Sequence, residues 1–550
     1  MLYLAAFVSG FLGVSALLSR EGGVTPDPRA LLEQGIEALG GAANIAQVHG
    51  VTYAGSKSYR TKTLMQSFSL DGVDRGVSVL GTQDVSFSFD GPQIKQRLHV
   101  DHQLDGFWSG FSRPNLDHVG FTIIVHGGDD GFAAVTEGNR NMFDPSAGPQ
   151  GYVDGVLAAY LIKEANKMSP FLISKILANN NFTYREEALW TGERLHGVYD
   201  GNFDLTVLFD PETSLPYAIR SAENHDIFGP STNDLVVYDY IESNGVKFPT
   251  GWKTFYNGRH LLMTSGVSQV LVNPSFATGF FDGPSDLSRL EKPRKSPQQD
   301  FSEVGERSGV YIWLGPFAMT AANISASQPL PELPGLWYLQ VGNARPTYRQ
   351  VVLVLEDSVI VMDSPPHQSL LVLEWIEQTI GRKVTHVWPT HHHHDHSSGL
   401  KDYVNAGAKV IVPVEAKPYY SAIPGIEFLT FTTDEPFALN GDKIQIRFMH
   451  MKASMHSFDH TYAVIFPSQP MPNSTMAVFD ADHGRNETET IPVPADDVLM
   501  TELVKALVDD RVASHATLIS AHVPIMPVAA LFRRTKIRSN NYSTLDFKYI

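Results

Sequence analysis

The chain has 550 residues, and its 43% of hydrophobic side chains is enough to fill two or three cores, which excludes a disordered protein. With 59 acidic and 42 basic residues it carries a net charge of -17, so the expected partner is a small molecule, not nucleic acid; composition indicates no oligomeric state. The absence of cysteine excludes disulfides, thiol catalysis and sulfur-ligated metal sites, so that any metal must be held by nitrogen and oxygen.

The first 19 residues form an apolar segment that turns polar at Arg20 and has small side chains at residues 14–16. This pattern predicts a secretory signal peptide, and hence a secreted protein with no stable membrane insertion once the signal is removed. A short membrane anchor is the alternative, because no Lys or Arg precedes the apolar stretch. Sequons for N-glycosylation fit the secretory route and lie at Asn181, Asn323, Asn473, Asn486 and Asn541.

Residues 28–283 have the pattern of an antiparallel β-rich domain. An amphipathic helix is predicted within 28–45, ending near Gly40-Gly41, and further helices are expected near 150–180. Alternating strand-like runs follow, and Asn244-Gly245 lies between two of them as a hairpin turn. This region resembles the half-barrels of lipoprotein carriers, although a packed structural domain fits the same pattern.

A stretch rich in Pro, Ser and mixed charge, residues 284–304, predicts a linker to a second domain at 305–535, with a C-terminal tail at 536–550. In the second domain apolar strands alternate with helices: two strands within 348–364, a helix within 368–381, a strand within 383–390, and then another helix and strand. This order predicts α/β organisation, in which functional residues gather on loops beyond the strand ends.

The sequence "THHHHDHSSG" at 390–399 places five of the 21 histidines in six positions, directly after a predicted strand. In an extended segment residues i and i+2 point the same way, so His391 and His393 are expected to converge on one ion. Asp395 and His396 supply ligands for a second ion, and imidazole suits zinc. By the same argument His392 and His394 point away, as outer-shell or surface residues. An affinity tag would lie at a chain end and would not be interrupted by an aspartate.

The pattern Thr-His-x-His-x-Asp-His-x-x-Gly resembles the signature of metallo-β-lactamase-fold hydrolases over about 330–530. The resemblance implies an αββα sandwich with two metal ions at one edge of its sheets, and three further ligands downstream. His456 is the first choice for the next ligand and His460 the second, while His450 is expected to be structural. Asp482 is the first choice for the bridging carboxylate and Asp480 the alternative. His522 follows the last strand. Asp363 matches a position that orients the metal ligands through hydrogen bonds, and a turn former before Ser-Pro-Pro is the alternative for it.

The resemblance therefore implies two zinc ions, one bound by His391, His393 and His456, the other by Asp395, His396 and His522, with Asp482 shared. A hydroxide bridging two such ions hydrolyses substrates at neutral pH, and Asp395 is a candidate general acid/base. The predicted function is hydrolysis of an ester, lactone, thioester or amide bond in a small organic molecule. The alternative is a hydrophobic-ligand carrier whose metal site is structural or vestigial.

Overall fold

The computed structural model describes residues 25–62, 78–104, 119–138, 150–153, 155–189, 191–288, 290–294, 320–341, 349–365, 368–452, 454–484 and 494–550. The predicted signal peptide, most of the predicted linker and the sequon at Asn486 lie outside these ranges. No helix within them has both the length and the apolar character needed to cross a bilayer.

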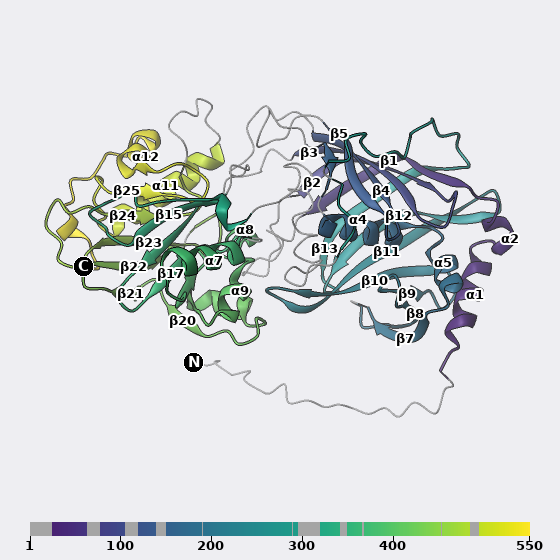
Figure 1. The fold of residues 1–550 in the computed structure, drawn as a ribbon, viewed down its shortest axis with the longest axis horizontal. Coiled ribbons are helices and arrows are strands. Elements are labelled where there is room, and N and C mark those ends of the chain that lie inside the picture. The colour runs from purple at the N-terminus through teal and green to yellow at the C-terminus, as the bar shows by residue number, and fades with distance from the viewer. Residues whose placement is uncertain are drawn as a thin grey trace, which may run out of the picture.

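One antiparallel sheet of thirteen strands dominates the first half of the chain, as the alternating pattern predicted (Figure 1). Its strands lie in the order β6-β5-β4-β3-β2-β1-β13-β12-β11-β10-β9-β8-β7. The strands are β1 (Gly50–Lys62), β2 (Ser78–Ser88), β3 (Lys95–Leu104), β4 (Val119–His126), β5 (Phe132–Gly138), β6 (Gly151–Tyr152), β7 (Phe182–Ala188), β8 (Arg194–Asp200), β9 (Leu205–Phe209), β10 (Pro216–His225), β11 (Gly229–Ser243), β12 (Val246–Tyr256) and β13 (His260–Val272).

The predicted turn at Asn244-Gly245 joins β11 to β12, with Ser243 paired to Val246. Both turn residues have positive φ, 53° and 74°, which a two-residue hairpin of this hand requires and which Asn and Gly tolerate. The pairing of β1 with β13, in contrast, joins strands more than 200 residues apart, as in Val51 with Val272. This long-range pairing joins the strands β1–β6 to the strands β7–β13 in a single sheet.

Helices fill one face of this sheet. They are α1 (Pro28–Ala38), α2 (Ala42–Ile45), α4 (Gly155–Met168) and α5 (Leu172–Asn179). Leu32 of α1, Leu157 of α4 and Ile176 of α5 share one buried core with sheet residues such as Tyr53 and Trp252. A cavity of about 20 Å³ beside Lys167 has room for roughly one water molecule.

Two further sheets make up the second half. The seven-stranded sheet contains, in spatial order, β14 (Ile324–Ser327), β15 (Leu336–Val341), β16 (Arg349–Val354), β17 (Val359–Met362), β18 (His386–Trp388), β19 (Lys409–Pro413) and β20 (Phe428–Phe431). The six-stranded sheet contains β21 (Phe437–Asn440), β22 (Ile444–His450), β23 (Thr461–Pro467), β24 (Ala477–Phe479), β25 (Thr517–Ile519) and β26 (Met526–Pro527). The pairs from β17 to β20 are parallel, as the predicted strand-helix-strand order requires.

The two sheets share one apolar core, in which Trp388 of the first meets Phe448 and Phe479 of the second. The helices α7 (Ser369–Thr379), α9 (Leu400–Asn405) and α10 (Lys417–Tyr420) pack on the first sheet, and α11 (Pro494–Asp509) and α12 (Val528–Thr535) on the second. The predicted tail is packed as well, since Phe547 is buried in the core beneath α11 and α12. The predicted metal ligands thus lie on loops at the ends of strands from these two sheets.

The turn between β10 and β11 joins the two halves of the chain. Ile227, at this turn, is fully buried in the core of the first sheet of the second half. Beside it, Asp226 forms an ion pair with Lys401 of α9, with 2.8 Å between Asp226 Oδ1 and Lys401 Nζ. In Figure 1, α8 (His394–Ser397) and α9 lie on the side of the second half that faces the β-rich half.

Candidate metal centre

The histidine run follows β18, but it does not continue as a strand. Residues 390–393 form a bend, and His394 begins the short helix α8. The premise of an extended segment was therefore wrong. The rings of His391 and His393 nevertheless approach to 4.4 Å between centroids, because the bend brings them to the same side of the loop.

Asp482 lies at the centre of the predicted ligands. Its carboxylate contacts four imidazoles through their Nε2 atoms, at 3.4 Å from His391, 3.2 Å from His396, 3.1 Å from His456 and 3.2 Å from His522. Asp482 follows β24, whereas the four histidines come from three other loops. The structure thus gathers residues up to 131 positions apart around one carboxylate (522 minus 391).

The remaining two predicted ligands border this group. Asp395 Oδ2 lies 3.3 Å from His396 Nε2 and 3.5 Å from His522 Nε2. The ring centroid of His393 lies 4.7 Å from that of His456. In the described part of the chain, several sets of three His or Asp side chains have ligand atoms that all lie within 4.8 Å of one another, and His393 belongs to none of these sets. All seven predicted ligands therefore meet in one buried cluster.

The cluster fits metal ions. The Nε2 atoms of His391 and His456 are 3.0 Å apart, and those of His396 and His522 are 3.3 Å apart. Two nitrogens bound to one tetrahedral zinc at roughly 2.0–2.1 Å would lie about 3.3 Å apart. In addition, Asp395 Oδ1 is buried with no hydrogen-bond partner in the described part of the chain. A cation would satisfy these facing acceptor atoms.

The electrostatics divide the histidines into two kinds. Burial and the neighbouring imidazoles hold the pKa values of His391 and His393 well below the usual range, so these rings are neutral. Burial also disfavours a charge on His396, but the carboxylates of Asp395, Asp363 and Asp482 raise its pKa well above the usual value.

The carboxylates respond in the opposite sense. Although burial raises the pKa of a carboxyl group, His396 and further histidines hold the pKa values of Asp395 and Asp482 well below the usual range. Both groups are therefore anionic and available to a cation.

Asp363, at the end of β17, contacts two residues of the histidine run on the side away from Asp482. Its Oδ2 accepts a 2.9 Å hydrogen bond from His396 Nδ1, and its Oδ1 accepts one of 2.8 Å from the backbone N–H of Thr390. The first contact fixes the tautomer that turns His396 Nε2 toward Asp482. Thr390 Oγ1, in turn, lies 3.1 Å from His391 Nδ1. Through these contacts Asp363 orients the ring of His396 and the start of the histidine run.

The two other histidines of the run are buried and partnered. His392 Nδ1 lies 2.8 Å from Asp459 Oδ1, in the loop that also carries His456. His394 is fully buried, with Nε2 2.8 Å from Tyr419 Oη, and its ring lies 5.4 Å from that of His225 in the β-rich half. The expectation of a surface place for either residue was wrong, because both sides of the loop are covered by other segments.

The alternatives at the two open positions, His460 and Asp480, lie together beside the cluster around Asp482. Asp480 accepts hydrogen bonds from His460 Nε2 at 2.9 Å, from His483 Nδ1 at 3.1 Å and from the backbone N–H of Asp482 at 3.2 Å. His483 Nε2 lies 3.4 Å from Glu502. Sequence reasoning missed His483 and Glu502, although His483 directly follows Asp482.

His450 lies outside both clusters. Its Nδ1 is 3.1 Å from Thr433 Oγ1 and its Nε2 is 3.0 Å from the carbonyl oxygen of Phe458. Both ring nitrogens are therefore used in hydrogen bonds, as expected for a structural histidine.

Residues 345–522, which contain the whole cluster around Asp482, match the model of the Metallo-beta-lactamase superfamily. The match covers 178 of the 550 residues, all of them in the second half of the chain. None of the curated proteins matches the chain.

Two solved structures are each similar to a part of this chain. A metallo-beta-lactamase from Pontibacter korlensis is 15% identical, with a TM-score of 0.31, over 39% of this chain and 98% of that chain. The DIM-1 metallo-beta-lactamase exposed to ceftazidime is 14% identical, with a TM-score of 0.31, over 40% of this chain and 98% of that chain.

Proposed function

We propose that the protein is a metal-dependent hydrolase that binds two zinc ions in an αββα domain. The observation that carries this proposal is the contact of four imidazoles with the single carboxylate of Asp482, beside a second anionic carboxylate, Asp395. A structural zinc site is a closed set of four ligands, whereas this cluster offers seven.

The ligands divide as the superfamily resemblance implies. His391, His393 and His456 would hold one ion, Asp395, His396 and His522 the other, and Asp482 would bind both. Two ions held this way would lower the pKa of a water bridging them and polarise the bond to be hydrolysed. Asp395 Oδ1 is buried and without a partner among the described residues, which supports a role in which it would accept a proton from water and return it to the leaving group.

The proposed substrate is a small organic molecule with an ester, lactone, thioester or amide bond. The net charge of -17 supports a partner other than nucleic acid. The alternative, a hydrophobic-ligand carrier, is less well supported, because α1, α4 and α5 pack against the described face of the large sheet in one buried core.

We also propose that the protein is a secreted glycoprotein. The four sequon asparagines within the described ranges, Asn181, Asn323, Asn473 and Asn541, are all exposed, as glycosylation requires. The apolar segment at 1–19 supports the secretory route. Sequencing the N-terminus of the protein purified from its secreting cells tests this proposal, and a retained residue 1 would contradict it.

The hydrolase proposal is tested by zinc analysis together with assays on chromogenic esters, lactones, thioesters and amides. About two zinc ions per chain are expected, with hydrolysis lost on chelation and in His391→Ala. The control is His515→Ala, an exposed histidine of the same domain, which should keep both zinc and activity. Full zinc occupancy with no turnover in any class, and tight binding of a fluorescent lipid, would instead support the carrier.

A further inference from the structure

His460 lies at the edge of the metal centre, directly before β23, with its side chain fully buried. Its position is fixed by the next residue, Thr461, whose backbone N–H and Oγ1 both donate to the carbonyl oxygen of Thr390, at 2.8 and 2.7 Å. Thr390 directly precedes His391. The backbone of His460 is therefore tied to the start of the ligand run.

The tautomer of His460 follows from its contact with Asp480. Asp480 Oδ1 accepts hydrogen bonds from two backbone N–H groups, those of Asp482 at 3.2 Å and His483 at 2.8 Å, so this carboxylate is surrounded by donors. Its other oxygen, Oδ2, is the atom that meets His460, and a carboxylate oxygen accepts there as well. The 2.9 Å contact with His460 Nε2 is therefore an N–H donated by histidine. The lone pair of the ring is left on Nδ1.

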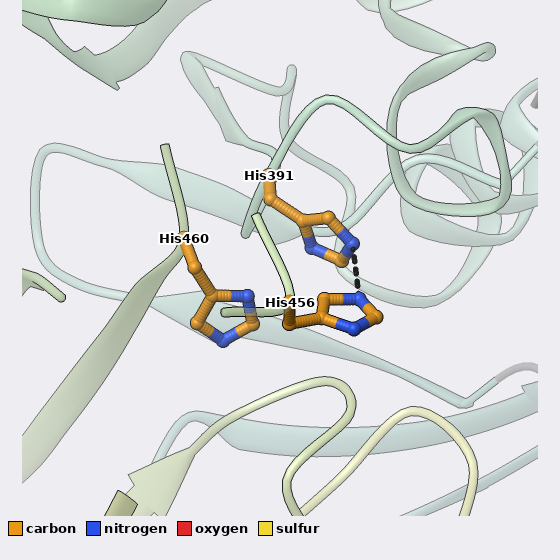
Figure 2. Close-up of side chains that lie close together, drawn as sticks. All are labelled: His391, His456 and His460. Carbon is orange, nitrogen blue, oxygen red and sulfur yellow. Dashed lines mark hydrogen bonds between the residues drawn. The ribbon is translucent and has the colours of Figure 1, made fainter. Parts of the chain in front are cut away.

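This Nδ1 atom has no hydrogen-bond partner in the described part of the chain, and it is buried. Figure 2 shows that it lies on the side of the ring facing His456 and His391, while Nε2 points away. Nitrogens of His391, His456 and His460 all lie within 4.8 Å of one another. A buried acceptor without a donor is costly, and this one lies beside two predicted zinc ligands, His391 and His456.

The arrangement repeats one already present at the other side of the centre. There, Asp363 accepts from His396 Nδ1, so that His396 presents its opposite nitrogen to the ligand cluster. Here, Asp480 accepts from His460 Nε2, so that His460 presents Nδ1. Metal-binding histidines usually donate their second ring N–H to a carboxylate or carbonyl in this way.

We propose that His460 is a further zinc ligand, whose Nδ1 binds the same ion as His391 and His456. The proposal rests on the proposed function, and it adds one imidazole to the set that the Thr-His-x-His-x-Asp-His motif and its downstream partners supply. Asp480 acts as the positioning residue of this ligand, and His483, held by Glu502, keeps Asp480 in place.

The test compares His460→Ala with His450→Ala in the full chain. His450 is the matched control because it is buried nearby but uses both ring nitrogens in hydrogen bonds. Zinc affinity is measured by competition with a chromophoric chelator, the visible spectrum of the Co²⁺-loaded protein reports coordination, and circular dichroism reports folding. His460→Ala should weaken one of the two ions by more than about tenfold and change the Co²⁺ spectrum.

Added imidazole should restore the Co²⁺ spectrum of His460→Ala and leave that of His450→Ala unchanged. The proposal is overturned if folded His460→Ala binds two zinc ions with wild-type affinity and an unchanged Co²⁺ spectrum. If alanine prevents folding, His460→Gln is measured in the same way and decides. The variant His391→Ala distinguishes failure of this inference from failure of the proposed function. If His391→Ala loses zinc and His460→Ala does not, only the inference about His460 fails. If neither variant loses zinc, the proposed function fails.

Discussion

Asp363 and His396 are joined by a 2.9 Å hydrogen bond between a carboxylate oxygen and Nδ1 of the ring. Asp363 also has φ of 62°, a left-handed conformation that Asp and Asn tolerate better than most residues. The bond therefore depends on a backbone geometry at the end of β17 as well as on the carboxylate itself. One aspartate sets both the direction of a ligand and the course of the chain after the strand.

Replacing this carboxylate should weaken zinc binding without unfolding the domain. Asp363→Asn keeps the size and the tolerance of positive φ but loses the charge that orients His396. We expect zinc affinity to fall by about 10- to 100-fold, measured by chelator competition. Asp357→Asn, an exposed change in the preceding turn, is the control. An affinity equal to wild type in Asp363→Asn would show that the ring is held by its other contacts.

Removing the charge of Asp482 should be more severe, because this carboxylate contacts four histidines. We expect the zinc content of Asp482→Asn to fall from two ions per chain to one or none, and its rate of hydrolysis to fall by about a hundredfold or more. Elemental analysis after dialysis and the initial rate on the best substrate measure both effects. Asp509→Asn, at the exposed end of α11, should change neither. Two retained ions in Asp482→Asn would contradict the shared role.

Zinc binding should release protons. The carboxylates raise the pKa of His522 and, more strongly, of His396, so these rings hold protons that an ion must displace. Affinity should therefore fall as the pH is lowered below the raised pKa values, by about tenfold per pH unit for each displaced proton. Calorimetry in buffers of different ionisation enthalpy counts the protons. Heats that do not depend on the buffer would argue that both rings are already neutral.

His394 should matter for stability and not for zinc. Its ring fills a buried space between Tyr419 and the rings of His225 and Phe228. We expect His394→Ala to lower the free energy of unfolding by about 2 kcal/mol, from the cavity it leaves, while zinc content stays at the wild-type value. Urea unfolding of the metal-free protein measures the first effect. His196→Ala, exposed in the β-rich half, is the control, and loss of an ion in His394→Ala would instead identify a ligand.

The local parts of the fold were predictable from sequence. The Asn244-Gly245 hairpin, the helices near 150–180 and the parallel strands β17, β18 and β19 follow from turn residues and hydrophobic period, which act over short distances. The pairing of β1 with β13 does not, because periodicity states that a residue is in a strand and not which strand lies beside it. The single sheet of thirteen strands could not be inferred for that reason.

The candidate site shows the same division. Spacing within 391–396 and the order of the downstream residues were sufficient to nominate the seven residues that the structure brings together. The surroundings of His392, His394 and His460 were not predictable, because each depends on a segment far away in the chain. The argument from an extended loop also failed at His394, where α8 begins and side chains no longer alternate.

The turn at 226–228 has a consequence for how this chain can be divided. Because Ile227 is buried in the core of the second half and Asp226 pairs with Lys401, the β-rich half supplies part of the wall behind the histidine run. A recombinant fragment that starts at the linker would lack Ile227, which would expose the apolar side chains that pack around it. It would also lack Asp226, the ion-pair partner of Lys401 on α9. A design that transfers this metal centre to another scaffold would therefore have to include the turn at 226–228, which precedes the histidine run by about 165 residues (391 minus 226).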